Sequence, residues 1–162
     1  QQLSIAVNIS VVQFSKDNFV QTVLHALKTT DANPQLLKLV ITETLLANNI
    51  HYVTDKMKEF QQTGVTFSID DFGTGYSSLS YLKQLPINQL KIDQGFVRDI
   101  INSSNDRAIA QAVITLANSM ELQVIAEGVE TEAQRALLQS MGCHTYQGYL
   151  YGKPCRIEEL HF

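Results

Sequence analysis

Apolar and polar positions alternate along the chain in a way that predicts strands and helices in nearly regular succession. Short runs rich in Val, Ile and Leu are separated by longer stretches in which apolar residues recur every three or four positions. The short runs predict strands over 4–9, 37–42, 65–70, 89–92, 123–127 and, with a weaker pattern, 145–150. The longer stretches predict helices over 18–27, 50–62, 78–82, 108–118 and 132–141. Repeated strand–helix units of this kind predict a parallel sheet.

Residues at the expected helix ends support these boundaries. Gly64 and Gly142 follow two of the predicted helices, in the place where a helix commonly ends on a residue with positive φ. Asp106 and Thr131 precede two others, and their side chains can accept a hydrogen bond from the first helical turn. We therefore predict that Gly64 and Gly142 mark the C-terminal ends of helices, and that Asp106 and Thr131 are N-caps.

Side-chain alternation within the strands distinguishes two kinds of parallel sheet. In the strand over 65–70, Val65, Phe67 and Ile69 share one face, and the alternate residues, ending with Asp70, share the other. The same division occurs over 5–10, 89–93 and 123–127. A doubly wound sheet is covered by helices on both faces and is expected to show continuous apolar runs. The alternation favours an α/β fold of the TIM-type (β/α) barrel class, with helices outside and a polar inner rim.

Polar side chains gather where these strands end. Near successive strand ends, the inner face carries Asn8, Val40, Asp70, Lys91, Glu127 and, after the last run, Gln147. Active sites of (β/α) barrels lie at the carboxyl ends of their strands. The pattern therefore predicts a functional site along this rim, in which Val40 is the apolar exception.

The adjacent pair Asp70 and Asp71, within FSIDDFGTGYSS, is the clearest chemical signal. Two neighbouring carboxylates near the interior of a fold are costly unless a cation neutralises them. Carboxylate and amide oxygens suit Mg²⁺ or Mn²⁺, and the scattered histidines and cysteines do not form a zinc-binding pattern. Lys91 suits an anionic substrate or an attacking water. The set predicts metal-assisted hydrolysis of a phosphate ester.

Composition sets bounds on partners and location. The 162 residues, 44% hydrophobic and 17% charged, are enough for one domain with a core. A net charge of −4 argues against a nucleic acid polymer held on a broad basic surface. Two cysteines are too few for a disulfide framework and no apolar run has the length of a membrane span, so we expect a cytoplasmic domain. Because the chain begins with Gln1, we expect a fragment of a longer protein.

Six motifs follow one another in the order found in a known family. They are NISVVQF (8–14), ITE (41–43), DDFGTGYSS (70–78), LKID (90–93), AEGVET (126–131) and QGYLYGKP (147–154). Together they resemble the EAL domain, a family of bacterial phosphodiesterases that hydrolyse cyclic di-GMP to linear pGpG with Mg²⁺ or Mn²⁺. The resemblance runs from about residue 3 to residue 154. It implies an eight-stranded barrel, cyclic di-GMP as the ligand and a part in second-messenger signalling.

The resemblance also implies a role for each matching residue. The metal ligands of the family match Asn8, Asp70, Asp71 and Glu127. The other site positions match Lys91 beside the catalytic water, Glu130 in the EGVE motif, Gln147 lining the site, and Glu43, which braces the DDFG loop. The loop over 70–78 resembles a segment that couples dimerisation to activity.

Two departures from the family limit the expected activity. Val40 stands where the family has a metal-binding glutamate, three residues before Glu43. The EAL signature itself is absent, together with the two strand–helix units that precede NIS in the family. We therefore expect residues 1–162 to be the C-terminal portion of a single EAL domain, with about six of its eight barrel units. The two missing carboxylates imply weakened metal binding and negligible turnover.

The missing units also bear on partners. Strand edges left open expose unpaired backbone groups, and we expect a second copy in a homodimer to cover them. Members of the family often carry sensor or diguanylate-cyclase-like (GGDEF-type) domains upstream. We expect such a domain, or a membrane anchor, in the parent protein.

Structural interpretations remain open beside the functional ones. Taken singly, Asp70 and Asp71 are consistent with a turn, Asn8 with a strand-end amide, Lys91 with a surface ion pair and Glu127 with a first-turn acid. Three functions also remain. The first is an active phosphodiesterase, favoured by DDFGTG, Lys91 and Glu127. The second is a degenerate receptor for cyclic di-GMP or a partner protein, favoured by Val40. The third is an interaction scaffold without nucleotide affinity.

Overall fold

Five parallel strands form one sheet in which each strand pairs with the next one along the chain. The structure is a computed structural model, and it describes residues 3–74 and 79–160. The strands are β1 (Ile5–Asn8), β2 (Leu37–Thr42), β3 (Thr66–Phe72), β4 (Gln89–Ile92) and β5 (Gln123–Ala126). Their spatial order is β1-β2-β3-β4-β5, and every pair is parallel. A sheet wound in one direction in this way is the arrangement of a (β/α) barrel, here with five strands and an open side.

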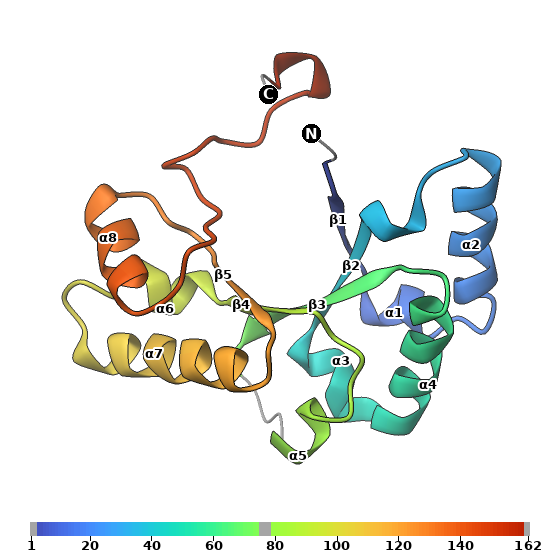
Figure 1. Ribbon diagram of the computed structural model, residues 1–162, viewed down its shortest axis with the longest axis horizontal. Helices are drawn as coiled ribbons and strands as arrows, with labels where there is room; N and C mark the ends of the chain where they lie inside the picture. Colours follow the sequence, from blue (N-terminus) through green and yellow to red (C-terminus); the bar gives the residue numbers. More distant parts are fainter. Residues whose placement is uncertain (1–2, 75–78, 161–162) are drawn as a thin grey trace.

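Helices connect successive strands and cover the outer face of the sheet (Figure 1). Those between β1 and β3 are α1 (Val11–Phe14), α2 (Phe19–Thr29), the 3₁₀ turn η1 (Pro34–Leu36), α3 (Glu43–Asn48) and α4 (Ile50–Gln61). Those after β3 are α5 (Leu79–Leu82), α6 (Gln94–Arg98), α7 (Ser104–Ser119), α8 (Glu132–Ser140) and η2 (Ile157–Glu159). None of the helices in residues 3–74 and 79–160 has the length and hydropathy that a membrane span requires.

Most of the elements expected from the pattern are present. The bounds of β2 and β4 agree with the prediction. Thr131 caps α8: its hydroxyl oxygen accepts a hydrogen bond from the Gln134 amide, and its own amide donates to the Gln134 side chain. Gly142 follows the C-cap of α8 with φ of 96°, as predicted. Asp106 does not cap α7, because the helix begins one turn earlier and Ser103 accepts the hydrogen bond from the Asp106 amide.

The predicted sixth strand over 145–150 is not a strand. It is reduced to a single parallel bridge between Ala126 and Tyr146, and the chain then enters a turn. Gly148, two residues after the bridge, lies in close contact with the backbone of Val129. The hydrogen bonds beyond the bridge join this segment to the loop that follows β5. The expected six barrel units are therefore five strands and one bridge.

The outer face of the sheet forms the core, as the alternation predicted. Leu39 and Ile41 of β2, Phe67 and Ile69 of β3 and Leu90 of β4 are each at most 1% exposed. The helices meet them with apolar stripes at helical spacing, such as Val53, Met57 and Phe60 of α4. A continuous series of aromatic contacts joins α1, α2, α4 and β3 through Phe14, Phe19, Phe60 and Phe67.

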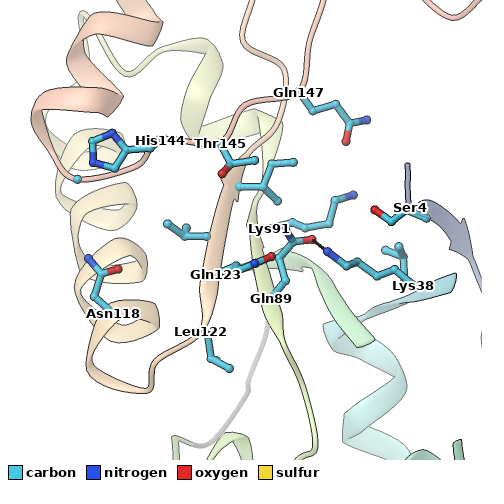
Figure 2. Close-up of a pocket in the computed structure, with 15 residues that line it drawn as sticks. Ser4, Lys38, Gln89, Lys91, Asn118, Leu122, Gln123, His144, Thr145 and Gln147 are labelled. Atoms are coloured by element: carbon cyan, nitrogen blue, oxygen red, sulfur yellow. Dashed lines mark hydrogen bonds between the residues drawn. The ribbon is translucent and has the colours of Figure 1, made fainter. Parts of the chain in front are cut away.

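Strand β1 is the exposed edge of the sheet. All four of its residues are exposed, and Ile5 retains 66% of its accessible surface although its side chain lies on the helix-facing side. The inner face beside β1 opens into a cavity of about 620 Å³ (Figure 2), whose lining includes Lys38, Val40, Gln89 and Lys91. Within the described residues, the inner face of the barrel is therefore accessible from the side.

Candidate metal centre

Asp70 and Asp71 lie at the carboxyl end of β3, where the strand departs from regular pairing. The register between β3 and β4 shifts between Ile69 and Phe72, and Asp71 has φ of 55°. An irregularity of this kind turns consecutive side chains in the same direction, which regular pleating does not allow. The Asp71 amide donates to Oδ1 of Asp70 at 3.1 Å, which fixes the relative orientation of the pair.

Lys91 and Glu127 reach the same point from the next two strands. Nζ of Lys91 lies 3.1 Å from Oδ2 of Asp70 and also contacts Oε1 of Glu127. The side chain of Lys91 is 9% exposed, that of Asp70 is 16% exposed and that of Glu127 is 15% exposed. Carboxylate oxygens of Asp70, Asp71 and Glu127 lie within 4.8 Å of one another. The structure thus brings together four of the residues expected from the sequence, from three adjacent strands.

Electrostatics at this cluster reflect an excess of negative charge. Burial raises the pKa of Glu127 to about 7; Lys91 works in the opposite direction, and the Asp70 carboxylate adds to the rise. Burial likewise raises the pKa of Asp71, with further increases from the charges of Asp70 and Asp93. Burial would lower the pKa of Lys91, but its contacts with Glu127 and Asp70 outweigh this and hold it above its usual value. One lysine does not neutralise three carboxylates.

Glu43 lies beside this cluster in the position expected of a bracing residue. It is the first residue of α3, it is 5% exposed, and its Oε2 accepts a hydrogen bond from the amide of Gly73 at 3.2 Å. Gly73 has φ of 101°, and an added Cβ would come 3.2 Å from the ring of Phe96. The turn after β3 is thereby held between α3 and α6. The rest of the GTGYSS loop, residues 75–78, lies outside the described residues.

Three further expected site residues are exposed near the carboxyl ends of the strands. Asn8 ends the edge strand β1 and is exposed. Glu130 is also exposed, and its backbone amide donates to Oε1 of Gln134. Gln147 is exposed and lines the open cavity together with Lys91 (Figure 2). Among the His, Cys, Asp and Glu residues that the structure describes, the group close enough to share a metal ion is Asp70, Asp71 and Glu127.

Asp93 is a further carboxylate at the site that the sequence reasoning left without a role. It caps α6 by accepting a hydrogen bond from the Gly95 amide at 2.8 Å, and it also faces Asp71 closely enough to raise the pKa of that residue. The signal in the sequence was its place two residues after Lys91 in LKID. A residue that only caps a helix would occupy the same place in the sequence. The contact of Asp93 with Asp71 is therefore the observation that makes it part of the site.

The donor set fits a hard divalent cation. Three carboxylates within reach of one another offer oxygen ligands, and the raised pKa values of Asp71 and Glu127 mark charge that a cation would neutralise. No histidine or cysteine joins this group among the described residues, so soft-metal chemistry has no ligand here. The site can hold a metal ion, and Lys91, which contacts two of its carboxylates, also lines the open cavity.

Comparison with known proteins identifies the family of the chain. The family model of the EAL domain matches residues 1–154, nearly the whole chain. The chain belongs to the EAL domain family. The solved structure titled as a cyclic di-GMP complex of the PaMucR phosphodiesterase superposes with a TM-score of 0.94 at 42% identity, covering 96% of this chain and 63% of that one.

Named relatives of this EAL chain are much longer proteins. The bifunctional diguanylate cyclase/cyclic di-GMP phosphodiesterase MucR of Pseudomonas aeruginosa is 43% identical over 157 residues, which cover 97% of this chain and 23% of MucR. The cyclic di-GMP phosphodiesterase NbdA of the same organism is 41% identical over 160 residues, 99% of this chain and 20% of NbdA. The chain thus spans less than a quarter of the length of these relatives.

Val40 is the apolar exception on the inner face of this EAL chain, and the structure shows its surroundings. It is 3% exposed, lines the cavity, and lies in register between Asn8 of β1 and Ser68 of β3. Ser68 is fully buried, and its Oγ is the one buried side-chain polar atom in the described part of the chain without a hydrogen-bond partner. A buried hydroxyl without a partner is costly. The hydroxyl of Ser68, beside Val40, is therefore a hydrogen-bond donor without an acceptor in the described part of the chain.

Proposed function

We propose that the chain is part of a metal-dependent cyclic di-GMP phosphodiesterase domain, which hydrolyses cyclic di-GMP to linear pGpG in bacterial signalling. The observation that carries the proposal is the meeting of Asp70, Asp71 and Glu127 with Lys91 at the strand ends of an EAL chain. Relatives named as cyclic di-GMP phosphodiesterases, and a related structure titled as a cyclic di-GMP complex, support the same substrate.

Asp70, Asp71 and Glu127 would hold Mg²⁺ or Mn²⁺, with Asn8 as a further oxygen donor at the edge strand. When bound, the ion would offset the charge of the carboxylates and polarise a phosphoryl oxygen of the substrate. A related structure, BlrP1 of Klebsiella pneumoniae, is titled as a manganese/cyclic di-GMP complex; it is 31% identical, has a TM-score of 0.85, and the match covers 94% of this chain and 39% of that one.

The side chains of this protein would orient the water and the nucleotide. Lys91 is positioned to hold a water or a phosphate oxygen beside Asp70 and Glu127. Glu130 and Gln147 are exposed on the same rim, where we assign them to proton transfer and to contacts with the nucleotide, respectively. Glu43 would keep the turn at Gly73 in place.

A second function, a cyclic di-GMP receptor without hydrolysis, is favoured by Val40. An apolar side chain at this point removes one oxygen ligand, and we expect weakened metal binding and negligible turnover in residues 1–162. Under this proposal the chain is the C-terminal portion of one cytoplasmic EAL domain. A homodimer, and an upstream sensor or GGDEF-type domain, are part of the same proposal.

Binding and turnover of cyclic di-GMP separate these functions. We would measure both with Mn²⁺ on this chain and on the longer protein that carries it, with Val40→Glu compared in each. If Val40→Glu raises turnover, Val40 is the residue that limits hydrolysis. If the parent and variant proteins all bind cyclic di-GMP without hydrolysing it, the receptor function is favoured. Absence of both binding and turnover in every form would refute the proposal.

A further inference from the structure

Gly148 lies in the closest backbone contact made by any glycine in the described residues. A Cβ added to it would come 2.2 Å from the carbonyl oxygen of Val129 and 2.3 Å from its nitrogen. Heavy atoms do not approach a Cβ to this distance, so one of the two segments must move if residue 148 has a side chain. The φ of Gly148 is not positive. The requirement for glycine therefore comes from Val129 and not from the backbone conformation.

The contact belongs to a ladder that holds the loop carrying Glu127. Gln147 donates its amide to Ala126 at 2.8 Å, and its carbonyl accepts from the amide of Val129 at 3.0 Å. The amide of Leu150 then donates to the Val129 carbonyl at 3.0 Å. Glu127 sits inside this ladder, between Ala126 and Val129, so its backbone position depends on how closely the Gln147–Leu150 segment can approach.

The opposite side of the same loop is also fixed. Gly128 has φ of 68°, and a Cβ added there would come 2.8 Å from Cβ of Gln94 in α6. The amide of Glu127 donates to the carbonyl of Ile92 in β4. Because α6 blocks movement on one side, a displacement of Val129 by a side chain at residue 148 would be transmitted to Glu127.

We propose that Gly148 is a positioning residue for Glu127: the absence of its side chain lets the Gln147–Leu150 segment close on Val129 and thereby sets the Glu127 carboxylate against Lys91 and Asp70. This inference rests on the proposed function, in which Glu127 is a metal ligand. The contact between Glu127 and Lys91 supplies a second measure of its position that requires no metal.

The chain supplies a matched control four residues away. Gly152 lies two residues after the Gln147–Leu150 segment, its φ is also not positive, and a Cβ added to it meets no atom within 4 Å. Gly148→Ala and Gly152→Ala are therefore the same chemical change, with and without the clash. The two variants would be compared with the parent in denaturant unfolding and in binding of Mn²⁺, followed by the electron paramagnetic resonance of the free ion.

The first measurement is the coupling between Lys91 and Glu127, from a double-mutant cycle with Lys91→Met and Glu127→Gln in each background. We expect Gly152→Ala to retain the coupling and Gly148→Ala to lose at least half of it. The second is affinity for Mn²⁺, which we expect to fall at least tenfold in Gly148→Ala and to change less than twofold in Gly152→Ala. A purely structural glycine would lower stability and leave both quantities unchanged.

Coupling that is unchanged in Gly148→Ala overturns the inference, and so does unchanged affinity in a chain that binds Mn²⁺. If the parent chain does not bind Mn²⁺, the proposed metal site fails, while the coupling still decides the role of Gly148. If Gly148→Ala does not fold, Leu150→Pro provides the test, because proline lacks the amide that donates to Val129. Full coupling in that variant would likewise overturn the inference.

Discussion

Val40→Glu offers the most direct test of the metal centre, because it adds the carboxylate that the resemblance to the family implies at this position. The new side chain would start from a buried inner-face position, directly beside Ser68 on the neighbouring strand. Paired residues on adjacent strands are close enough for their side chains to interact. We therefore expect the Ser68 hydroxyl, which has no partner, to donate to the new carboxylate.

The expected magnitude follows from opposing effects. Loss of a buried valine costs about 1.5–3 kcal/mol, and burying a carboxylate adds a further penalty, whereas a hydrogen bond to a charged group returns about 1.5–3 kcal/mol. We expect a net loss of about 3 kcal/mol without metal, which lowers Tm by about 6–12 °C at the size of this chain. Mn²⁺ at one hundred times its Kd should restore about 2.7 kcal/mol.

The assay is thermal unfolding of the parent and variant chains with and without Mn²⁺. Val40→Gln is the matched control, since its side chain has the shape of glutamate without the charge. It should lose stability and gain no more from Mn²⁺ than the parent chain gains. Adding Ser68→Ala to Val40→Glu should lower the metal-free stability by about a further 2 kcal/mol. If Val40→Glu gains no more from Mn²⁺ than the parent chain gains, Val40 does not face the metal site and the reasoning is refuted.

Three further predictions concern other parts of the structure. Lys91→Met leaves the carboxylates of Asp70 and Glu127 without their cation, and should lower the free energy of unfolding in urea by about 3 kcal/mol. Mn²⁺ should restore part of this loss, and a loss that Mn²⁺ does not reduce would count against the metal site. Lys56→Met removes hydrogen bonds to the backbone carbonyls of Phe14 and Lys16, of which the first is buried, and should cost about 2 kcal/mol. Lys58→Met, on the exposed side of α4, should change stability little, and equal losses in the two variants would contradict this. Burial raises the pKa of the Cys143 thiol, so a thiol reagent at pH 8 should modify the exposed Cys155 quickly and Cys143 only on unfolding; two fast thiols would contradict the packing.

Local patterns predicted the elements of this fold well where they depend on nearby residues. The apolar runs located β2 and β4 at their observed bounds, and Thr131 marked the start of α8 correctly. The start of α7 was wrong because several polar residues near Ser103 and Asp106 can each cap a helix, and only the backbone conformation selects among them. The run over 145–150 resembles a strand in composition, but its pairing is limited to one bridge.

The rim of the sheet was likewise predictable, and its internal contacts were not. Alternation placed Asp70, Lys91 and Glu127 on one face, and parallel pairing then required their strand ends to be neighbours. The pattern did not indicate that Lys91 contacts two carboxylates at once. That contact depends on the bulge in β3 and on burial, neither of which has a periodic signature.

The sequence by itself determined the succession of strands and helices, the polar inner face, the family and the place where Val40 departs from it, because these depend on residue type and spacing along the chain. Tertiary structure alone decided that Asp93 faces Asp71, that Ser68 beside Val40 lacks a hydrogen-bond partner, and that Gly148 closes on Val129. Each of these joins residues through the register and separation of neighbouring segments. Register and separation are set by packing across the whole sheet, so no short stretch of sequence contains them.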